Sequence, residues 1–230
     1  MCNVNVIFDM DGVIFDTERF CLECCVPAAE KVGLDNIAEI SMQCIGLTKE
    51  ATDQRLRDYY GPEAPLDQFD EELYRIFTER CEKEGMPVKD GARELLFWLK
   101  EKGIPVALAS STRTDIVCRE LRETGLYEYF DAIVGGDMVD RSKPAPDIFL
   151  KAAELLSCDP EQCTVIEDSF HGIRAAAAAG MRPVMVPDLL EPDGEIKALA
   201  HAVKASLFEV LDDFQEILAV TRVDKKDDSV

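Results

Sequence analysis

The sequence predicts an α/β fold: a Rossmann-like, doubly wound parallel sheet with an all-helical module inserted after the first strand. Three observations support this prediction. Short apolar runs without alternating polar residues recur along the chain, which is typical of strands buried on both faces of a parallel sheet. Helical patterns separate these runs after residue 87, as in strand–helix–strand units. Residues 17–87, by contrast, contain helical patterns and no convincing strand.

The bulk properties exclude several classes of partner. The chain has 230 residues and a formal net charge of −21, from 46 acidic and 25 basic residues. Nucleic acids and anionic membranes are bound through lysine and arginine, so we expect no nucleic acid and no membrane as partners. No run approaches the length of about 18 apolar residues that a membrane span needs. An anionic small substrate would need local positive charge, from a metal ion or a well-placed lysine.

Nine cysteines, an odd number, lie mostly within apolar patterns, and we expect no secretory leader before them. These features favour reduced thiols and a cytoplasmic protein, and the size is compatible with a monomer. A zinc site at Cys21, Cys24 and Cys25 is disfavoured, because no second cysteine pair with suitable spacing follows and the chain has only two histidines.

The first strand is predicted over residues 4–8, an apolar run rich in β-branched side chains. Asp9 and Asp11 follow it, and in an extended chain residues i and i+2 point to the same side. Two carboxylates that face one point need a cation, and a hard divalent ion with oxygen ligands suits them. Gly12 permits a sharp turn and the close approach of a ligand. An isolated Asp-x-Asp-Gly is more often an ordinary turn, so the remaining chain must decide.

A helical module is predicted to follow. Its first helix spans about residues 17–32 and stops at Gly33, and helical patterns continue through residues 34–85 with breaks near Gly61 and Pro65. The chain would leave the sheet near residue 17 and return near residue 87, so these two crossings would form a hinge.

After residue 87 the predicted strands and helices alternate, with capping residues and glycines at the helix ends. The predicted strands cover residues 104–110, 131–136, 163–169 and 182–187. The predicted helices cover residues 90–102, 114–123, 146–156, a segment through 175–179, and 206–219. The charged residues 221–230 are predicted to be a disordered tail.

Polar clusters follow three of the buried strands, at the sheet edge where parallel α/β proteins bind ligands. They are Asp9 with Asp11, Ser110 with Ser111, and Glu167-Asp168-Ser169. Carboxylates from two strands could grip Mg²⁺, which prefers few protein oxygens plus water and phosphate. Pro144 keeps Lys143 out of a helix, and one lysine on a rigid turn suits a bound anion. Considered alone, Lys143 is more often a solvated loop residue.

Together these residues can transfer a phosphoryl group. Asp9 would attack phosphorus as a carboxylate nucleophile and form an aspartyl-phosphate. A metal ion and Lys143 would neutralise the equatorial oxygens. Asp11 would protonate the leaving alkoxide and then deprotonate water. The groups that would hold the phosphoryl group are the Ser110 hydroxyl and backbone N–H groups near Gly12 and Ser111.

In this motif order the sequence resembles the haloacid dehalogenase superfamily, and within it the phosphatases of the β-phosphoglucomutase-like subgroup. The resemblance covers about residues 4–190 and rests on DMDGVIFDTE, the strand ending in ALAS, Lys143-Pro144, and Glu167-Asp168-Ser169. It implies a nucleophile at Asp9, an acid/base at Asp11, and a helical cap domain that closes over the substrate. It also implies Mg²⁺ held by the Asp9 side chain, the Asp11 carbonyl and the Asp168 side chain. Glu167 would lie nearby, either as a ligand or bridged by water.

The resemblance divides the chain into domains and separates it from two relatives within the superfamily. The α/β core would comprise residues 1–16 and 88–220, and the cap residues 17–87. Asp11 argues against true haloacid dehalogenases, which lack the second aspartate. Sugar-phosphate mutases carry a histidine ten residues after that aspartate, which couples cap closure to proton transfer. Here that position is Cys21, and a neutral thiol does this poorly.

We therefore expect a Mg²⁺-dependent phosphatase that hydrolyses a small phosphorylated metabolite, such as a sugar phosphate. A phosphomutase of the β-phosphoglucomutase type is the alternative, and a non-catalytic binding protein is a weaker third. The candidate specificity contacts in the cap are the helix face around Arg19 and Phe20, the run Gly46-Leu47-Thr48, and Arg55. For Arg55, an ordinary place on the helix surface is the commoner interpretation. The sequence does not identify the substrate.

Overall fold

The structure, a computed structural model, describes residues 4–45 and 49–227 and is built around a six-stranded sheet. The strands lie in the order β3-β2-β1-β4-β5-β6, and all neighbours are parallel. Their bounds are β1 Asn5–Phe8, β2 Val106–Ala109, β3 Ala132–Val134, β4 Cys163–Glu167, β5 Arg182–Met185 and β6 Ala202–Val203. The predicted parallel α/β fold is confirmed.

Two layers of helices cover the sheet, because alternate residues of each strand point to opposite faces. Val6 and Phe8 of β1 pack with α5, α6 and α10, whereas Ile7 packs with α7 and α8. The helices of this part are α5 Ala92–Glu101, α6 Thr114–Glu123, α7 Asp147–Leu156, α8 Phe170–Ala178, α9 Gly194–Leu199 and α10 Leu207–Asp227. Short 3-10 helices span Tyr127–Tyr129, Gly136–Met138 and Pro160–Gln162. The sheet is therefore doubly wound, as predicted.

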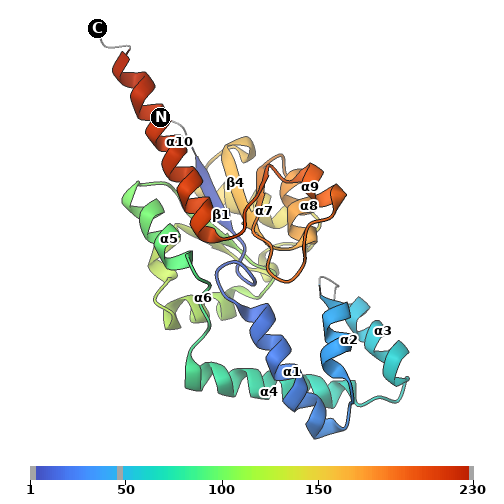
Figure 1. The fold of residues 1–230 in the computed structure, drawn as a ribbon. Helices are drawn as coiled ribbons and strands as arrows, with labels where there is room; N and C mark the ends of the chain where they lie inside the picture. Colours follow the sequence, from blue (N-terminus) through green and yellow to red (C-terminus); the bar gives the residue numbers. More distant parts are fainter. Residues whose placement is uncertain (1–3, 46–48, 228–230) are drawn as a thin grey trace.

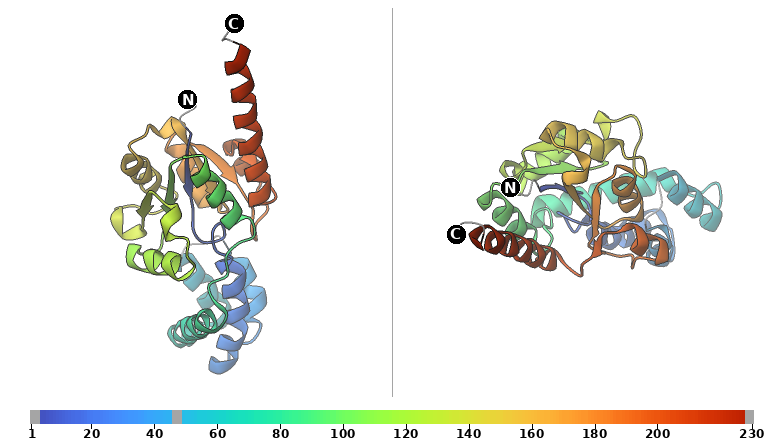
Figure 2. Two further views of the ribbon diagram at one scale, coloured as in Figure 1. Left: turned by 90° about the vertical axis from the view of Figure 1, so that its left-hand side faces the viewer. Right: turned by 90° about the horizontal axis from the view of Figure 1, so that it is seen from above.

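The inserted segment is helical throughout its regular structure, which agrees with the prediction for residues 17–87. Its helices are α1 Thr17–Val32, α2 Ile37–Cys44, α3 Lys49–Tyr60 and α4 Leu66–Glu84. Figure 1 and the left view of Figure 2 show them as a group at one end of the sheet, with both chain termini toward the other end. The group has its own apolar cluster, to which α1 contributes Cys25, Ala28 and Ala29. The domain boundaries drawn from the sequence remain a prediction.

The two crossings between the sheet and this helical module run side by side. The Asp16 N–H donates to the Pro87 oxygen at 2.9 Å, and the Lys89 N–H donates to the Ile14 oxygen at 2.9 Å. The Lys89 ammonium also lies 2.5 Å from a carboxylate oxygen of Asp188, which follows β5. The crossings therefore join the module to the core at one place, where a hinge was expected.

The structure differs from the predicted elements at the end of the chain. Strand β6 was not predicted, and α10 extends to Asp227, past the end expected near residue 219. The disorder predicted for residues 221–230 stays a prediction. The run Gly46-Leu47-Thr48 lies outside the described residues. No helix in the described part of the chain combines the length and apolar character that crossing a membrane requires.

Candidate active site

Asp9 leaves β1 at the edge of the sheet that faces the helical module. Its N–H donates to the Ile166 oxygen of β4 at 3.0 Å, which continues the β1–β4 pairing by one residue. Its side chain is nearly buried, with 7% of the residue exposed. Gly12 follows in the left-handed region at φ +78°, and a Cβ there would lie 2.2 Å from Asp168 Oδ2. Only glycine therefore lets the first loop pack directly against the loop after β4.

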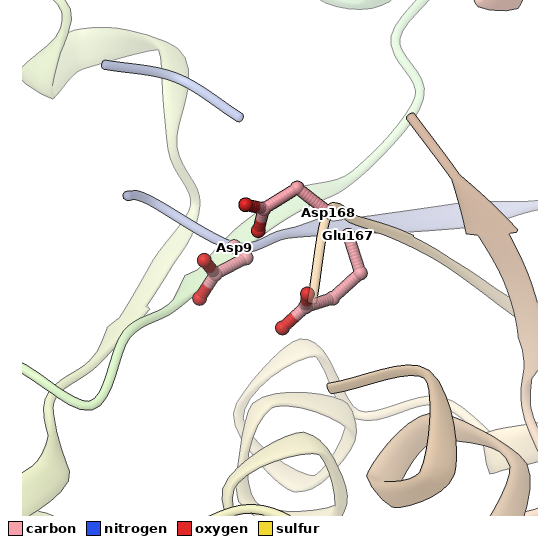
Figure 3. Close-up of side chains that lie close together, drawn as sticks. All are labelled: Asp9, Glu167 and Asp168. Carbon is pink, nitrogen blue, oxygen red and sulfur yellow. The ribbon is translucent and has the colours of Figure 1, made fainter. Parts of the chain in front are cut away.

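Three carboxylates gather at the ends of β1 and β4. One oxygen from each of Asp9, Glu167 and Asp168 lies within 4.8 Å of the others (Figure 3). Lys143, from the loop between β3 and α7, places its ammonium 2.5 Å from Asp9 Oδ1 and 2.7 Å from Glu167 Oε1. Its side chain is only 8% exposed, so the charges meet away from bulk water. Lys143 is thus a buried residue of this site rather than a solvated loop lysine.

Both carboxylate oxygens of Glu167 accept hydrogen bonds that hold the side chain in place. Oε1 accepts from Lys143, while Oε2 accepts from the Ser169 N–H at 2.7 Å and the Ser169 hydroxyl at 2.9 Å. A Cβ on Gly172 would lie 1.7 Å from Oε1, so a glycine in the first turn of α8 leaves room for the Glu167 side chain. Because its oxygens are already occupied, Glu167 is better placed to position Lys143 than to ligate a metal directly.

The Asp11 side chain points to other partners than this cluster. It accepts from the Thr17 hydroxyl at 2.7 Å and from the Thr112 hydroxyl at 3.4 Å. The i and i+2 argument assumed an extended chain, but the backbone bends at Met10, whose carbonyl accepts from Ile14 N–H at 2.8 Å. The carboxylate of Asp11 therefore faces a separate cavity of about 300 Å³.

Burial controls the protonation of these groups. It raises the pKa of Asp9 to about 7, although the attraction of Lys143 lowers it. Burial also raises the pKa of Asp11, against the lowering effect of the Thr17 hydrogen bond, and raises that of Asp168 well above its ordinary value. Burial would lower the pKa of Lys143, but the charges of Asp9 and Glu167 raise it, so the lysine stays charged. One lysine does not compensate all the buried carboxylates.

The predicted phosphate-binding serines lie beside this cluster at the end of β2. Ser110 is buried, and its hydroxyl accepts from the Thr112 N–H at 3.0 Å. The neighbouring Ala109 carbonyl is 3.4 Å from Lys143 Nζ, so the end of β2 reaches the lysine. The Ser111 side chain is exposed. Both serines therefore lie in the loop that approaches Asp11 through Thr112.

Some contacts were not predicted, and one predicted contact lies elsewhere. From the sequence, Thr17 was expected only to start a helix, whereas in the structure its hydroxyl also donates to Asp11. Arg55 donates to Gln43 at 2.6 Å on the surface of the helical module, which favours the ordinary interpretation of Arg55. Cys21 lines the cavity beside Asp11. One sequence signal could have identified Thr17: it is the first residue of the helix that follows the acidic motif, and is therefore close to the second aspartate.

The donor set fits a hard divalent cation such as Mg²⁺. Its atoms are carboxylate oxygens from two strands, which such ions prefer. The raised pKa values of Asp9 and Asp168 indicate that their charges are undercompensated, and a cation would offset them. The close contact of Gly12 with Asp168 also brings the first loop next to this set.

Comparisons with known proteins agree with this geometry. A family model described as haloacid dehalogenase-like hydrolase matches residues 6–186. A phosphorylated carbohydrates phosphatase of Thermotoga maritima is 34% identical over 220 residues, which cover 93% of this chain and 99% of the relative. A bifunctional riboflavin kinase/FMN phosphatase of Arabidopsis thaliana is 38% identical over 187 residues, covering 80% of this chain and 48% of the relative. The chain thus spans about half the length of that second protein.

A solved structure also resembles this chain over nearly its whole length. The crystal structure of a putative beta-phosphoglucomutase from Thermotoga maritima superimposes with a TM-score of 0.78 at 31% identity. The superposition covers 93% of this chain and 99% of that one, so it includes both the sheet and the helical module.

Proposed function

Because this chain belongs to the haloacid dehalogenase-like hydrolase family, we propose that it is a Mg²⁺-dependent phosphatase that hydrolyses a small organic monophosphate. The family membership agrees with the resemblance noted in the motifs. The observation that carries the proposal is the group of Asp9, Lys143 and Asp168, mostly shielded from solvent, at the carboxyl edge of the sheet. That group combines a nucleophile, a fixed positive charge and ligands for a cation, which phosphoryl transfer requires.

Asp9 is proposed as the nucleophile. One of its carboxylate oxygens attacks phosphorus, the bond from phosphorus to the substrate oxygen breaks, and an aspartyl-phosphate forms. Lys143 lies 2.5 Å from Asp9 Oδ1, so its charge also lies close to the phosphoryl oxygens during transfer. Glu167 keeps the lysine ionised and oriented. The Ser110 hydroxyl and backbone N–H groups near Gly12 and Ser111 are the proposed binding groups for the phosphoryl oxygens.

Asp11 is proposed as the general acid and base. The raised pKa of its carboxyl, caused by burial, favours the protonated form that donates to the departing alkoxide. The resulting carboxylate takes a proton from water, whose oxygen attacks phosphorus and releases Asp9 and inorganic phosphate. Its hydrogen bonds from Thr17 and Thr112 aim this carboxyl at the cavity rather than at the metal-binding carboxylates. The two aspartates thus have separate surroundings and separate tasks.

Mg²⁺ is the proposed cofactor, held by the Asp9 and Asp168 side chains and the Asp11 carbonyl. When bound, it would supply positive charge to the phosphoryl oxygens and offset the like charges of the ligands. Removing Mg²⁺ should therefore abolish turnover.

A phosphomutase is the second candidate, because the superimposed Thermotoga structure is described as a putative beta-phosphoglucomutase. Against it, Cys21 lines the cavity at the position where the mutases carry histidine. A mutase would isomerise a hexose phosphate, respond to a sugar bisphosphate and release little phosphate.

The test is phosphate release from a panel of metabolite monophosphates, with and without Mg²⁺. The proposal predicts Mg²⁺-dependent release that is lost in Asp9→Asn and kept in Asp67→Asn, a matched change at an exposed residue of α4. Turnover that survives Asp9→Asn would remove Asp9 from the nucleophile's role. Isomerisation of a hexose phosphate without net release would favour the mutase.

A further inference from the structure

The cavity beside Asp11 has a composition that bears on the choice of substrate. Its volume is about 300 Å³, and it lies between α1, α4 and α6. Its lining residues are Met10, Asp11, Thr17, Glu18, Cys21, Phe77, Met86, Thr112 and Glu120. Since Asp11 is the proposed proton donor to the leaving group, the leaving group must enter this space, and we call it the leaving-group pocket.

The charged side chains that line the leaving-group pocket are all acidic. Besides Asp11 they are Glu18 and Glu120, and none of the lining residues within the described ranges is lysine, arginine or histidine. Glu18 follows Thr17 in the first turn of α1, where the residue is exposed to solvent. The basic group on the phosphate side, Lys143, is already bound to two carboxylates.

Glu120 is the member of this set that the family motifs do not include. It lies on α6, and only 13% of its side chain is exposed. Burial raises its pKa to about 7, with a further contribution from the charge of Asp11 and opposition from Arg119. Thus the carboxylate lacks full compensation, and a ligand that donates hydrogen bonds or carries positive charge would supply it.

The nearest basic side chain does not line the leaving-group pocket, so the charge of the lining stays negative. Arg119 lines a neighbouring hollow of about 590 Å³ that shares Phe77, Met86 and Glu120 with the leaving-group pocket. Its guanidinium is 3.9 Å from Glu120 and 4.0 Å from Glu123, and its side chain is 56% exposed. It therefore faces two carboxylates and water, and it does not line the leaving-group pocket.

We propose that Glu120, together with Glu18, selects the leaving group by charge. Monophosphates whose organic part is uncharged and rich in hydroxyl groups, or carries an ammonium group, are accepted. Those that carry a carboxylate or a second phosphate in the organic part are disfavoured, because like charges at short range repel each other. This inference rests on the proposed phosphatase function and names its substrate class. It also makes a bisphosphate, which a mutase needs, a poor occupant.

Three matched three-carbon monophosphates test the inference: glycerol phosphate, phosphoglycerate, and the analogue of glycerol phosphate with a terminal ammonium group. They differ in the charge of one terminal group. For the wild-type protein, kcat/KM for glycerol phosphate (the diol) and for the ammonium analogue should exceed that for phosphoglycerate (the carboxylate) by about tenfold or more. A compound that is not turned over is measured as a competitive inhibitor of nitrophenyl phosphate hydrolysis, and the inhibition constants should follow the same order.

Glu120→Gln keeps the shape of the side chain and removes the charge that Glu120 carries above its pKa of about 7, so the assays are run at about pH 8.5. It should raise kcat/KM for the carboxylate relative to the diol by about fivefold. Glu123→Gln, on the same helix but outside the leaving-group pocket, should leave that ratio unchanged. Equal values for the three compounds in the wild type, or the same ratio in Glu120→Gln and the wild type, would overturn the inference. Nitrophenyl phosphate separates the two failures, since its Asp9-dependent hydrolysis tests the phosphatase function regardless of the terminal group.

Discussion

Replacing Lys143 with methionine should destabilise the folded protein far more than the loss of an ordinary ion pair. Lys143 lies 2.5 Å from Asp9 and 2.7 Å from Glu167, and its side chain is 8% exposed. Methionine retains an apolar stem near the Phe149 ring, over which the ammonium lies at 4.9 Å. The change therefore removes the charge while keeping most of the packing.

The size of the effect follows from the burial of both partners. Removing one member of a buried ion pair leaves an uncompensated charge and costs about 3–5 kcal/mol. In a chain of 230 residues, each kcal/mol lowers the melting temperature by about 2–4 °C. We expect a decrease of about 10 °C, and a smaller decrease near about pH 5, where the remaining carboxyls can take up protons.

Thermal unfolding followed by circular dichroism, with a chelator present, measures this decrease. The matched control is Lys151→Met, because Lys151 pairs with Glu154 at 2.9 Å on the surface, where an ion pair contributes less than about 1 kcal/mol. The reasoning would be refuted if Lys143→Met and Lys151→Met melted at the same temperature, or if the loss did not depend on pH.

Three further predictions concern the same site. In the absence of divalent cations, we expect the free energy of unfolding to depend on pH. It should fall by up to about 4 kcal/mol as the pH rises from about 4 to about 7. The cause is Asp9, whose pKa rises from 3.8 to about 7 on folding, so that the folded state binds the proton more tightly; urea unfolding at several pH values measures this loss. Gly172→Ala places a Cβ 1.7 Å from Glu167 Oε1 and should cost about 1–3 kcal/mol, measured by the same method. Thr17→Val removes a 2.7 Å hydrogen bond that lowers the pKa of Asp11. The limb of the pH–rate profile that reports Asp11 should therefore move to higher pH, and kcat should fall about tenfold.

Each of these has a control or a contrary outcome. For the glycine, Gly194→Ala meets open space at the start of α9, and it should be neutral or stabilising. For the threonine, Thr17→Ser keeps a hydroxyl and should restore the profile; an unshifted profile in Thr17→Val would mean that the bond does not affect the proton on Asp11. A stability that rises between about pH 4 and pH 7 would contradict the direction assigned to Asp9.

Most of the fold could be predicted because its strands are buried on both faces and bounded by turn residues. Strands β1, β2, β4 and β5 stand out as apolar runs for this reason. Strand β6, Ala202–Val203, has two residues and no pattern of its own; its pairing with β5 defines it. Such a strand depends on tertiary contacts, which sequence periodicity does not contain.

The sequence could predict at which edge of the sheet the site lies, but not which side chains contact one another there. Motifs at the ends of parallel strands meet by topology alone, and thus Asp9 and Asp168 were placed together correctly. The direction of Asp11 depends on a bend at Met10, which the alternation rule for extended chains cannot represent. Glu120 occupies a polar position of an amphipathic helix, and only the three-dimensional structure, in which residues of α4 and α6 line the same hollow, shows that it lines a pocket.

The central claim is that Asp9 becomes covalently phosphorylated during turnover. The most direct measurement is an acid quench of the protein during hydrolysis of a good monophosphate substrate, followed by mass spectrometry of its peptides. The account predicts a phosphoryl group on the peptide that contains Asp9, present only with Mg²⁺ and absent from Asp9→Asn. Rapid turnover with the phosphoryl group on a different residue, or with none on the wild-type chain at any time before substrate is exhausted, would contradict it.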